Sequence, residues 1–232
     1  DGKPEIPKIV KPEFTKLPID SARASAFLTM VLAMPAPAVE PRWLAAGRDY
    51  QITPVEGGRL YSAKNPYNDL FELTFYIERG WRHDRGLCAA IELLELSGAG
   101  PWPADEFKKK LFALGTSLNY SCGEQDSVIS LSGVDRNLWP SLELLNARFD
   151  WPNVAPGTLE RMVEITFGAR EDEKKDPGSI FHALEEFAAR GSDSEVLRRL
   201  TNAELKALPE SRLKSLTREL PQYPYRAAYV GN

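Results

Sequence analysis

The sequence predicts an α+β fold, because strand-like segments come in adjacent pairs and helical segments fill the intervals between those pairs. A strict alternation of single strands and helices, which a doubly wound parallel sheet requires, is absent. The chain has 232 residues, of which 43% are hydrophobic, so it is long enough to bury one sizeable core. We therefore expect one globular domain, from residue 43 to residue 232, preceded by an arm.

The arm is expected to span residues 1–42 and to be extended except for one short helix. Residues 1–19 contain four prolines and alternate charged with apolar side chains, which is typical of a linker. Asp20 or Ser21 is a suitable cap for a helix that runs through Met34, after which several prolines follow. Because the chain does not begin with Met, we expect it to be part of a longer protein.

The segment "ASAFLTMVLAMPAPA", residues 24–38, imitates the apolar core and cleavage site of a signal peptide. Its preceding flank is long and interrupted by prolines, so we interpret the segment as part of the arm. No apolar run reaches the ~20 residues that a membrane-spanning helix needs. The net charge of −4 and the scattered basic residues argue against a nucleic-acid partner.

The domain is expected to open with two strands and a helix. "RLYSAK" (59–64) and "LFELTFYIERG" (70–80) have the alternation and the aromatic or β-branched content of strands. "NPYND" (65–69) lies between them and is rich in residues that preset or tolerate turn dihedrals. A helix follows at about 85–97, where apolar residues recur at helical spacing.

A second helix and a second strand pair come next. Residues 103–115 form a helix in this prediction, because Pro103 lies near its start, acidic residues fill its first turn and Gly115 ends it. Residues 116–134 are expected to form two strands joined around Gly123.

The rest of the chain is expected to be mainly helical, and Thr201 and Pro209 mark the starts of the last two helices. A final strand closes the domain. The expected helices are 136–149, 157–175, 178–191, 201–208 and 209–220, and the strand is 225–232.

Cysteine and histidine are scarce. Cys88 and Cys122 are too few for a disulfide framework, and we expect two lone buried thiols unless the fold brings them together as one bridge. His83 and His182 are the only histidines, and we interpret them as a solvated loop residue and a helix-face residue. A cysteine-peptidase pairing between these residues has no local support.

The stretch "GLCAAIELLELSGAG", residues 86–100, has the position pattern of an inverted zinc motif without its histidines. Such a motif places His at i and i+4 on one helix face, with Glu at i+3 to polarise a zinc-bound water. The matching residues are Ala89, Glu92 and Leu93, and only the carboxylate could ligate a metal. The apolar residues form a helical stripe, so an amphipathic helix with an ordinary surface carboxylate is the simpler interpretation.

An ordered set of segments nevertheless resembles the pitrilysin/insulinase family of zinc metallopeptidases, whose relatives include the mitochondrial processing peptidases. The resemblance covers residues 43–232, and residues 1–42 resemble the linker between the halves of a fused family member. The segments are "NPYNDLFELTFYIERGW" (65–81), "GLCAAIELLELSGAG" (86–100), "FALGTSLNYSCGEQDSVISLSG" (112–133), "LWPSLELLNARFDWP" (138–152), "LTNAELKALPESRLKSLTREL" (200–220) and "AAYVGN" (227–232).

The resemblance implies an α+β domain in which helices cover an antiparallel sheet. In the family two such domains form a half, two halves close around a chamber, and usually only the first domain carries zinc. A distal Glu ligand lies on a later helix, seven residues after another Glu, and Glu164 and Glu171 show this spacing. With both histidine positions lost, Ala89, Glu92, Leu93 and Glu171 would be a vestigial motif, and we expect no zinc or other cofactor in this chain.

The resemblance also implies a peptide-binding sheet edge at Leu118, Asn119, Tyr120 and Ser121. Adding a peptide strand needs only free backbone groups, so this function can outlast the loss of zinc. The alternative is that Leu118 and Tyr120 simply pack or cover the edge.

The expected function is therefore that of a non-catalytic domain from the second half of an insulinase-like peptidase, which builds the chamber wall and helps hold an extended peptide. The catalytic zinc would lie on a partner domain or chain of the same fold. Two alternatives stay open: the fold could serve purely as an assembly scaffold, or the chain could be a hydrolase with an unrecognised site. A periplasmic or other extracytoplasmic location is implied by resemblance to bacterial relatives alone.

Overall fold

The computed structural model describes residues 24–35 and 40–232, and its chain divides into two units at Trp43 and Leu44. In the first unit, helix α1 (Ala26–Ala33) is capped by Ser25, whose side chain accepts a hydrogen bond from the backbone N–H of Leu28. The helix thus begins later than the start predicted at residue 20 or 21. The extended segment predicted at residues 1–19 lies outside the described residues.

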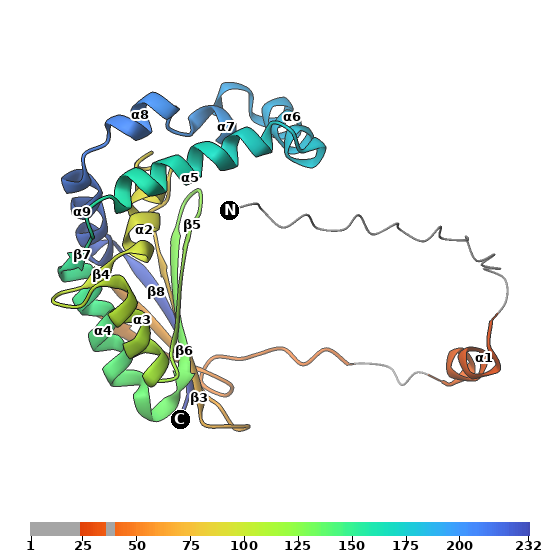
Figure 1. Ribbon diagram of the computed structural model, residues 1–232. Helices are drawn as coiled ribbons and strands as arrows, with labels where there is room; N and C mark the ends of the chain where they lie inside the picture. The colour runs from red at the N-terminus through yellow and green to blue at the C-terminus, as the bar shows by residue number, and fades with distance from the viewer. Residues whose placement is uncertain (1–23, 36–39) are drawn as a thin grey trace, which may run out of the picture. The chain divides into compact units, whose positions relative to one another are not determined.

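The second unit is built on a six-stranded sheet in the order β1-β2-β8-β3-β6-β5. Every neighbouring pair is antiparallel except β2 and β8, which run parallel. This confirms the predicted α+β class with a largely antiparallel sheet (Figure 1). The strands are β1 (Gln51–Val55), β2 (Gly58–Lys64), β3 (Leu70–Ile77), β5 (Ser117–Cys122), β6 (Ser127–Val134) and β8 (Tyr225–Gly231).

Strand β1 was not predicted, because Pro54 interrupts its pattern. The structure accommodates this proline at the outer edge of the sheet, where a missing N–H costs no ladder hydrogen bond. Gly57 has φ of +79° and makes the tight turn that joins β1 to β2. A small second sheet pairs β4 (Gly98–Ala99) with β7 (Pro152–Asn153), and it was also missed.

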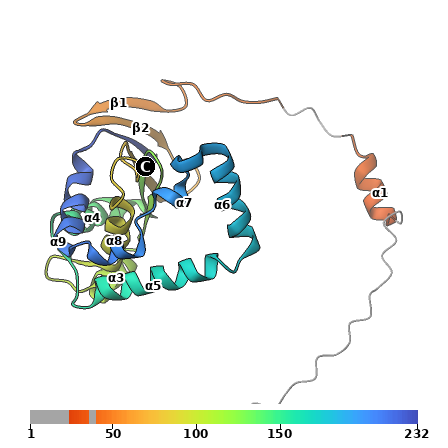
Figure 2. The same cartoon turned by 90° about the horizontal axis from the view of Figure 1, so that it is seen from above.

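The helices of the second unit gather on one side of the sheet and beyond one end of it (Figure 1). Figure 2 shows the same arrangement from above, with α5 and α6 forming an angular path toward α7. The helices are α2 (Leu87–Leu96), α3 (Ala104–Ala113), α4 (Leu138–Asp150), α5 (Thr158–Glu173), α6 (Pro177–Arg190), α7 (Glu195–Arg198), α8 (Asn202–Ala207) and α9 (Glu210–Glu219). The short α7 was not predicted as a helix.

The core lies between the sheet and helix α2. On β3 the alternate residues Phe71, Leu73 and Ile77 are buried against the helices. Helix α2 adds Leu87, Ile91, Leu94 and their apolar neighbours to the same core. Each such side chain contributes about 1.5–3 kcal/mol when fully buried. The apolar stripe predicted for this helix is therefore what fixes its position against the sheet.

None of the helices in residues 24–35 and 40–232 combines the length and the apolar character that crossing a membrane demands.

Candidate functional site

Helix α2 carries the three positions that the sequence resemblance assigns to a vestigial zinc motif, and two of them belong to the core. Leu93 is 2% exposed and Ala89 is 9% exposed, and both side chains pack in the main hydrophobic cluster. Only Glu92 reaches the surface of the helix. Among the described residues, no group of three or more His, Cys, Asp or Glu side chains is arranged to hold a metal ion.

The first turn of α2 is held by hydrogen bonds from side chains. The carboxylate of Asp84 accepts a hydrogen bond from the backbone N–H of Gly86 at 2.8 Å. The other oxygen of Asp84 accepts one from Arg212 of α9 at 2.6 Å. These bonds link the start of α2 to α9, which packs along it.

The last turn of α2 is held by Arg148 of α4, which is only 3% exposed. Its Nη2 donates hydrogen bonds to the carbonyl oxygens of Glu95 and Ser97, each at 2.6 Å. Its guanidinium also lies 4.5 Å from the ring centre of Phe107. A cation at this end complements the negative pole of the helix, so Arg148 fixes the orientation of α2. Sequence reasoning missed this residue because its partners are backbone atoms.

The two cysteines form a disulfide, contrary to the expectation of two lone thiols. Cys88 in the first turn of α2 is bonded to Cys122 at the end of β5, across 34 residues of sequence. The prediction was wrong because helix α2 packs directly on β5, and that tertiary contact brings the two Cα atoms within 5.3 Å. Both cysteines are half-buried.

Strand β5 contains the four residues predicted to form the peptide-binding edge. It is the last strand of the sheet and pairs only with β6 among the described strands. Asn119 and Ser121 are exposed, whereas Leu118 and Tyr120 are half-buried against the core. Burial raises the pKa of Tyr120 to about 12, although the charge of nearby Arg148 opposes the shift. The side chains of this strand thus pack, while one backbone edge has no neighbouring strand.

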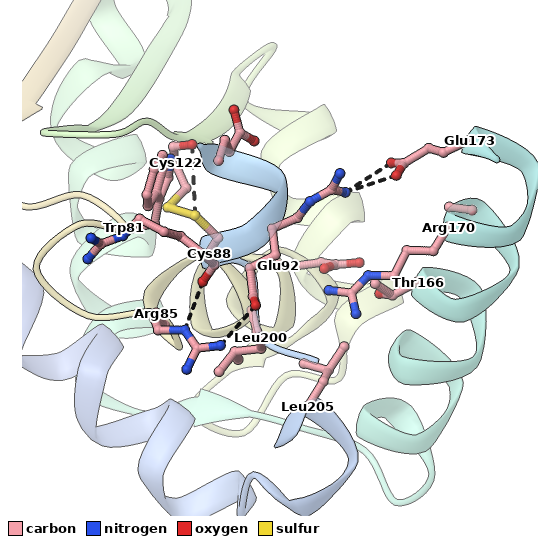
Figure 3. Close-up of a pocket in the computed structure, with 15 residues that line it drawn as sticks. Trp81, Arg85, Cys88, Glu92, Cys122, Thr166, Arg170, Glu173, Leu200 and Leu205 are labelled. Carbon is pink, nitrogen blue, oxygen red and sulfur yellow. Dashed lines mark hydrogen bonds and ion pairs between the residues drawn. A yellow bond between two sulfur atoms is a disulfide. The ribbon is translucent and has the colours of Figure 1, made fainter. Parts of the chain in front are cut away.

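A pocket of about 330 Å³ lies beside the end of β5, between α2, α5 and the segment from α7 to α8. Its walls combine charged groups with apolar ones (Figure 3). The lining residues with apolar side chains or sulfur atoms are Trp81, Cys88, Ala89, Cys122, Ala169, Leu200 and Leu205, and the polar or charged ones are Arg85, Glu92, Thr166, Arg170, Glu173, Glu195, Arg198 and Arg199.

Glu171, the predicted distal ligand position, does not line this pocket. Its side chain is 58% exposed and pairs with Lys174 at 2.5 Å, which lowers the pKa of its carboxyl group. Helix α5 instead presents Thr166, Arg170 and Glu173, which recur at helical spacing, to the pocket. Spacing between glutamates does not tell which face of an acid-rich helix meets α2, and the assignment of Glu171 to the distal position stays a prediction.

Most charges of the pocket are paired with neighbouring side chains. Arg85 donates to both oxygens of Glu204, at 2.8 and 2.9 Å, and this lowers the pKa of Glu204 to about 2. Arg85 also donates to the backbone oxygens of Arg198 and Arg199, at 2.8 and 2.9 Å. The guanidinium of Arg199 binds Glu173 at 2.9 Å. These bonds fix the segment between α7 and α8 as one wall.

Glu92 and Arg170 differ from their paired neighbours. Figure 3 shows their side chains pointing toward one another from α2 and α5. Although Glu92 is exposed by surface area, the surrounding walls reduce its hydration and raise its pKa; Glu95 raises it further and Arg170 opposes the shift. Burial and the neighbouring charge of Arg199 lower the pKa of Arg170. Both shifts mean that the site lacks groups that would stabilise these two charges.

The histidines lie apart from these features. His83 accepts a hydrogen bond at Nδ1 from the backbone N–H of Gly80 at 3.1 Å, and its side chain is exposed. His182 is exposed on α6, as the helix-face interpretation expects. Neither histidine lines the pocket that contains the disulfide.

No known family profile matches this sequence, and no curated protein sequence matches it. Solved structures do match its fold. The periplasmic protease PqqL from Escherichia coli has a TM-score of 0.64 and 15% identity, over 90% of this chain and 26% of that one. The peptidase M16 inactive domain from Pseudomonas fluorescens has a TM-score of 0.65 and 16% identity, over 78% of this chain and 46% of that one.

The ferredoxin protease FusC, solved as a point mutant in complex with Arabidopsis ferredoxin, also matches, with a TM-score of 0.64 and 14% identity. The match covers 86% of this chain and 24% of FusC. The chain therefore spans between about a quarter and a half of the length of these structures. Its fold is that of an M16, or pitrilysin-type, peptidase domain, as the sequence resemblance implied.

Proposed function

We propose that this chain, whose fold is that of the M16 peptidase domains, is a non-catalytic domain of such a peptidase. It forms part of a chamber wall and holds an extended peptide along the edge of β5. The observation that carries the proposal is the composition of α2: at the positions that the resemblance assigns to the zinc ligands, Ala89 and Leu93 stand instead of histidine and pack in the core. The zinc belongs to a partner domain of the same fold.

The unpaired edge of β5 supports the peptide-binding part of this proposal. Among the described residues the strand ends the sheet, so the backbone groups on its outer side have no strand partner there and can pair with an added strand. The disulfide from Cys122 to Cys88 and the packing of Tyr120 hold the strand in place. A fixed edge loses less conformational entropy when it binds a peptide.

An apolar surface on α6 supports the presence of a partner domain. Four large side chains of this helix, spaced so that they share one face, are between 45% and 62% exposed: Ile180, Phe181, Leu184 and Phe187. Exposed apolar patches of this kind mark protein–protein contacts. The match covers only 24–46% of these three structures, which leaves room for such a partner.

The disulfide supports an extracytoplasmic location for this chain. Structural disulfides persist in oxidising compartments such as the bacterial periplasm and are rare in the cytosol. PqqL is described as a periplasmic protease. A free-thiol assay on protein isolated from its natural host, with immediate alkylation, is expected to find Cys88 and Cys122 oxidised.

Peptide binding at β5 can be tested with backbone-modified peptides. Labelled, unstructured peptides of roughly 12 residues, long enough to pair with the whole strand, are titrated against the chain and followed by fluorescence anisotropy. A binder is then N-methylated at alternate positions, in two complementary sets. One set should lose binding and the other should keep it, because an added strand uses every second N–H.

Equal binding of both methylated peptides would rule out strand addition at β5. If no peptide binds, the result would instead favour the alternative function of this fold as an assembly scaffold.

A further inference from the structure

The pocket beside β5 contains an acid, Glu92, and a base, Arg170, that face one another without forming an ion pair. Within the described residues, the carboxylate of Glu92 has no hydrogen bond and no ion pair. The guanidinium of Arg170 donates only to the side-chain oxygen of Asn202, at 2.6 Å. The charge of each residue shifts the pKa of the other, yet Glu92 and Arg170 do not form an ion pair across the pocket. A ligand between them could contact both.

Most of the other charges around the pocket are committed to partners. The exception is the carboxylate of Glu195, which is exposed and has no ion pair among the described residues. Arg199 pairs with Glu173, Arg198 pairs with Asp193 at 2.7 Å, and Arg85 pairs with Glu204. Arg199 also lies close enough to Arg170 to lower the pKa of Arg170 by charge repulsion. An anionic group at Arg170 would relieve this repulsion.

A simple anion does not satisfy the site, because Glu92 would repel it. A metal ion does not satisfy it either, because one carboxylate beside an arginine is not a ligand set. A molecule that carries both an ammonium and a carboxylate satisfies both residues at once. The volume of about 330 Å³ and the apolar walls of Trp81, Leu200 and Leu205 leave room for an apolar side chain beside the two charged groups.

We propose that this pocket binds a zwitterion of amino-acid or dipeptide size, with its carboxylate on Arg170 and its ammonium on Glu92. The apolar side chain of the ligand lies against Leu200, Leu205 and Trp81. Thr166, whose hydroxyl donates to the backbone oxygen of Met162, also lines the pocket and offers an acceptor to the ammonium group. This inference goes beyond peptide binding at β5 and does not depend on it.

The test uses the full chain and isothermal titration calorimetry with four probes. L-leucine and L-alanyl-L-leucine carry both charges, N-acetyl-L-leucine carries only the carboxylate, and L-leucinamide carries only the ammonium. The two zwitterions are compared with each other to decide whether an amino acid or a dipeptide fits better. Each single-charge probe should bind about tenfold more weakly than the better zwitterion, or worse, because one charge-assisted contact is lost.

Two variants and two matched controls complete the test. Arg170→Gln and Glu92→Gln should each weaken the better zwitterion by about tenfold or more. Arg161→Gln and Glu164→Gln remove the same charges from exposed positions of α5 outside the pocket and should leave binding unchanged. If Arg170→Gln fails to fold, Glu92→Gln and the four probes on the unmodified chain still decide the question.

Three results would overturn the proposal. The first is that neither zwitterion binds. The second is that N-acetyl-L-leucine or L-leucinamide binds as tightly as the better zwitterion. The third is that the control variants weaken binding as much as Arg170→Gln and Glu92→Gln do.

Discussion

At the scale of single residues, Arg148 shows how one buried guanidinium positions a helix. Its charge has no carboxylate partner among the described ion pairs, and its hydrogen bonds go to two carbonyl oxygens at the end of α2 and to the hydroxyl of Tyr120. Removing this group would leave buried carbonyl oxygens without donors, and each such loss costs about 1–3 kcal/mol.

We therefore expect Arg148→Ala to lower the free energy of unfolding by about 2–4 kcal/mol, because it loses two hydrogen bonds to carbonyls and leaves a cavity. Arg148→Lys should lose less, since it keeps the charge and one donor nitrogen but not the planar guanidinium that lies over Phe107. Urea unfolding followed by circular dichroism measures the free energy of unfolding of both variants. Arg161→Ala, at an exposed position, is the control and should change that free energy by under ~0.5 kcal/mol. An unchanged urea midpoint for Arg148→Ala would contradict the role given to this residue.

Glu92 gives the opposite case, a charge that the fold does not stabilise. Its pKa is raised in the folded state, so its ionised form is disfavoured there and the protein loses stability as pH rises through that folded-state pKa. The charges that act on it are Glu95 on α2 and Arg170 on α5. The other charged groups of the pocket are Arg85 in the loop before α2, Glu173 on α5, and Glu195, Arg198 and Arg199 in and after α7.

Glu92→Gln should therefore leave the protein equally stable or slightly more stable at pH 7, by well under ~1 kcal/mol because the side chain is exposed. The difference from the unmodified chain should vanish as pH falls below the usual range of glutamate pKa values. Melting temperatures across roughly pH 4–8 test this, beside Glu164→Gln as a control for net charge. A lower melting temperature of Glu92→Gln at pH 7 would show that the carboxylate has a stabilising partner.

At the scale of elements, the disulfide joins α2 to β5 and so connects the vestigial motif to the open sheet edge. It closes a loop of 34 residues, which corresponds to about 3–4 kcal/mol of stabilisation in the chain-entropy description. Reduction of the disulfide, or replacement of Cys88 and Cys122 by Ser, should lower the free energy of unfolding by an amount of this order.

Hydrogen exchange provides the local readout for this prediction. Amides of β5 and of the first turn of α2 should exchange faster after reduction, whereas those of β3 should change less, because β3 lies inside the sheet between β8 and β6. Uniform changes across the domain would mean that the bond does not act on this pair of elements.

The same helix determines what restoration of the zinc motif would do. In the double variant Ala89→His with Leu93→His, an imidazole would replace a leucine that is 2% exposed, and burial of a polar group without a partner costs free energy. Arg170, a cation, faces Glu92 from α5, and Glu171 lies outside the pocket. We expect a lower melting temperature, no stoichiometric zinc by elemental analysis, and no peptide cleavage above background. Zinc-dependent cleavage that a chelator abolishes would contradict this prediction.

At the scale of the whole molecule, the order and type of most elements could be predicted from the sequence, because strand alternation, turn residues and helix caps are local signals. The burial of Phe71, Leu73 and Ile77 on one face of β3 is such a case. The disulfide, the two contacts of Arg148 with α2 and the facing of Arg170 toward Glu92 could not be predicted. Each depends on which elements pack together across tens of residues, and no local pattern contains that information.

The position of β8 has a consequence for how this unit is made. The strand is formed by residues 225–231, yet it lies inside the sheet, parallel to β2 and antiparallel to β3. Until the ribosome has released these residues, the β1–β2 hairpin and the β3–β6–β5 part of the sheet have no strand between them. The two inner edges are then exposed on the nascent chain, where they are open to pairing with other chains. On a chain made from its N-terminus, the sheet can therefore be completed only when β8 pairs with β2 and β3, a long-range step of the kind that slows folding.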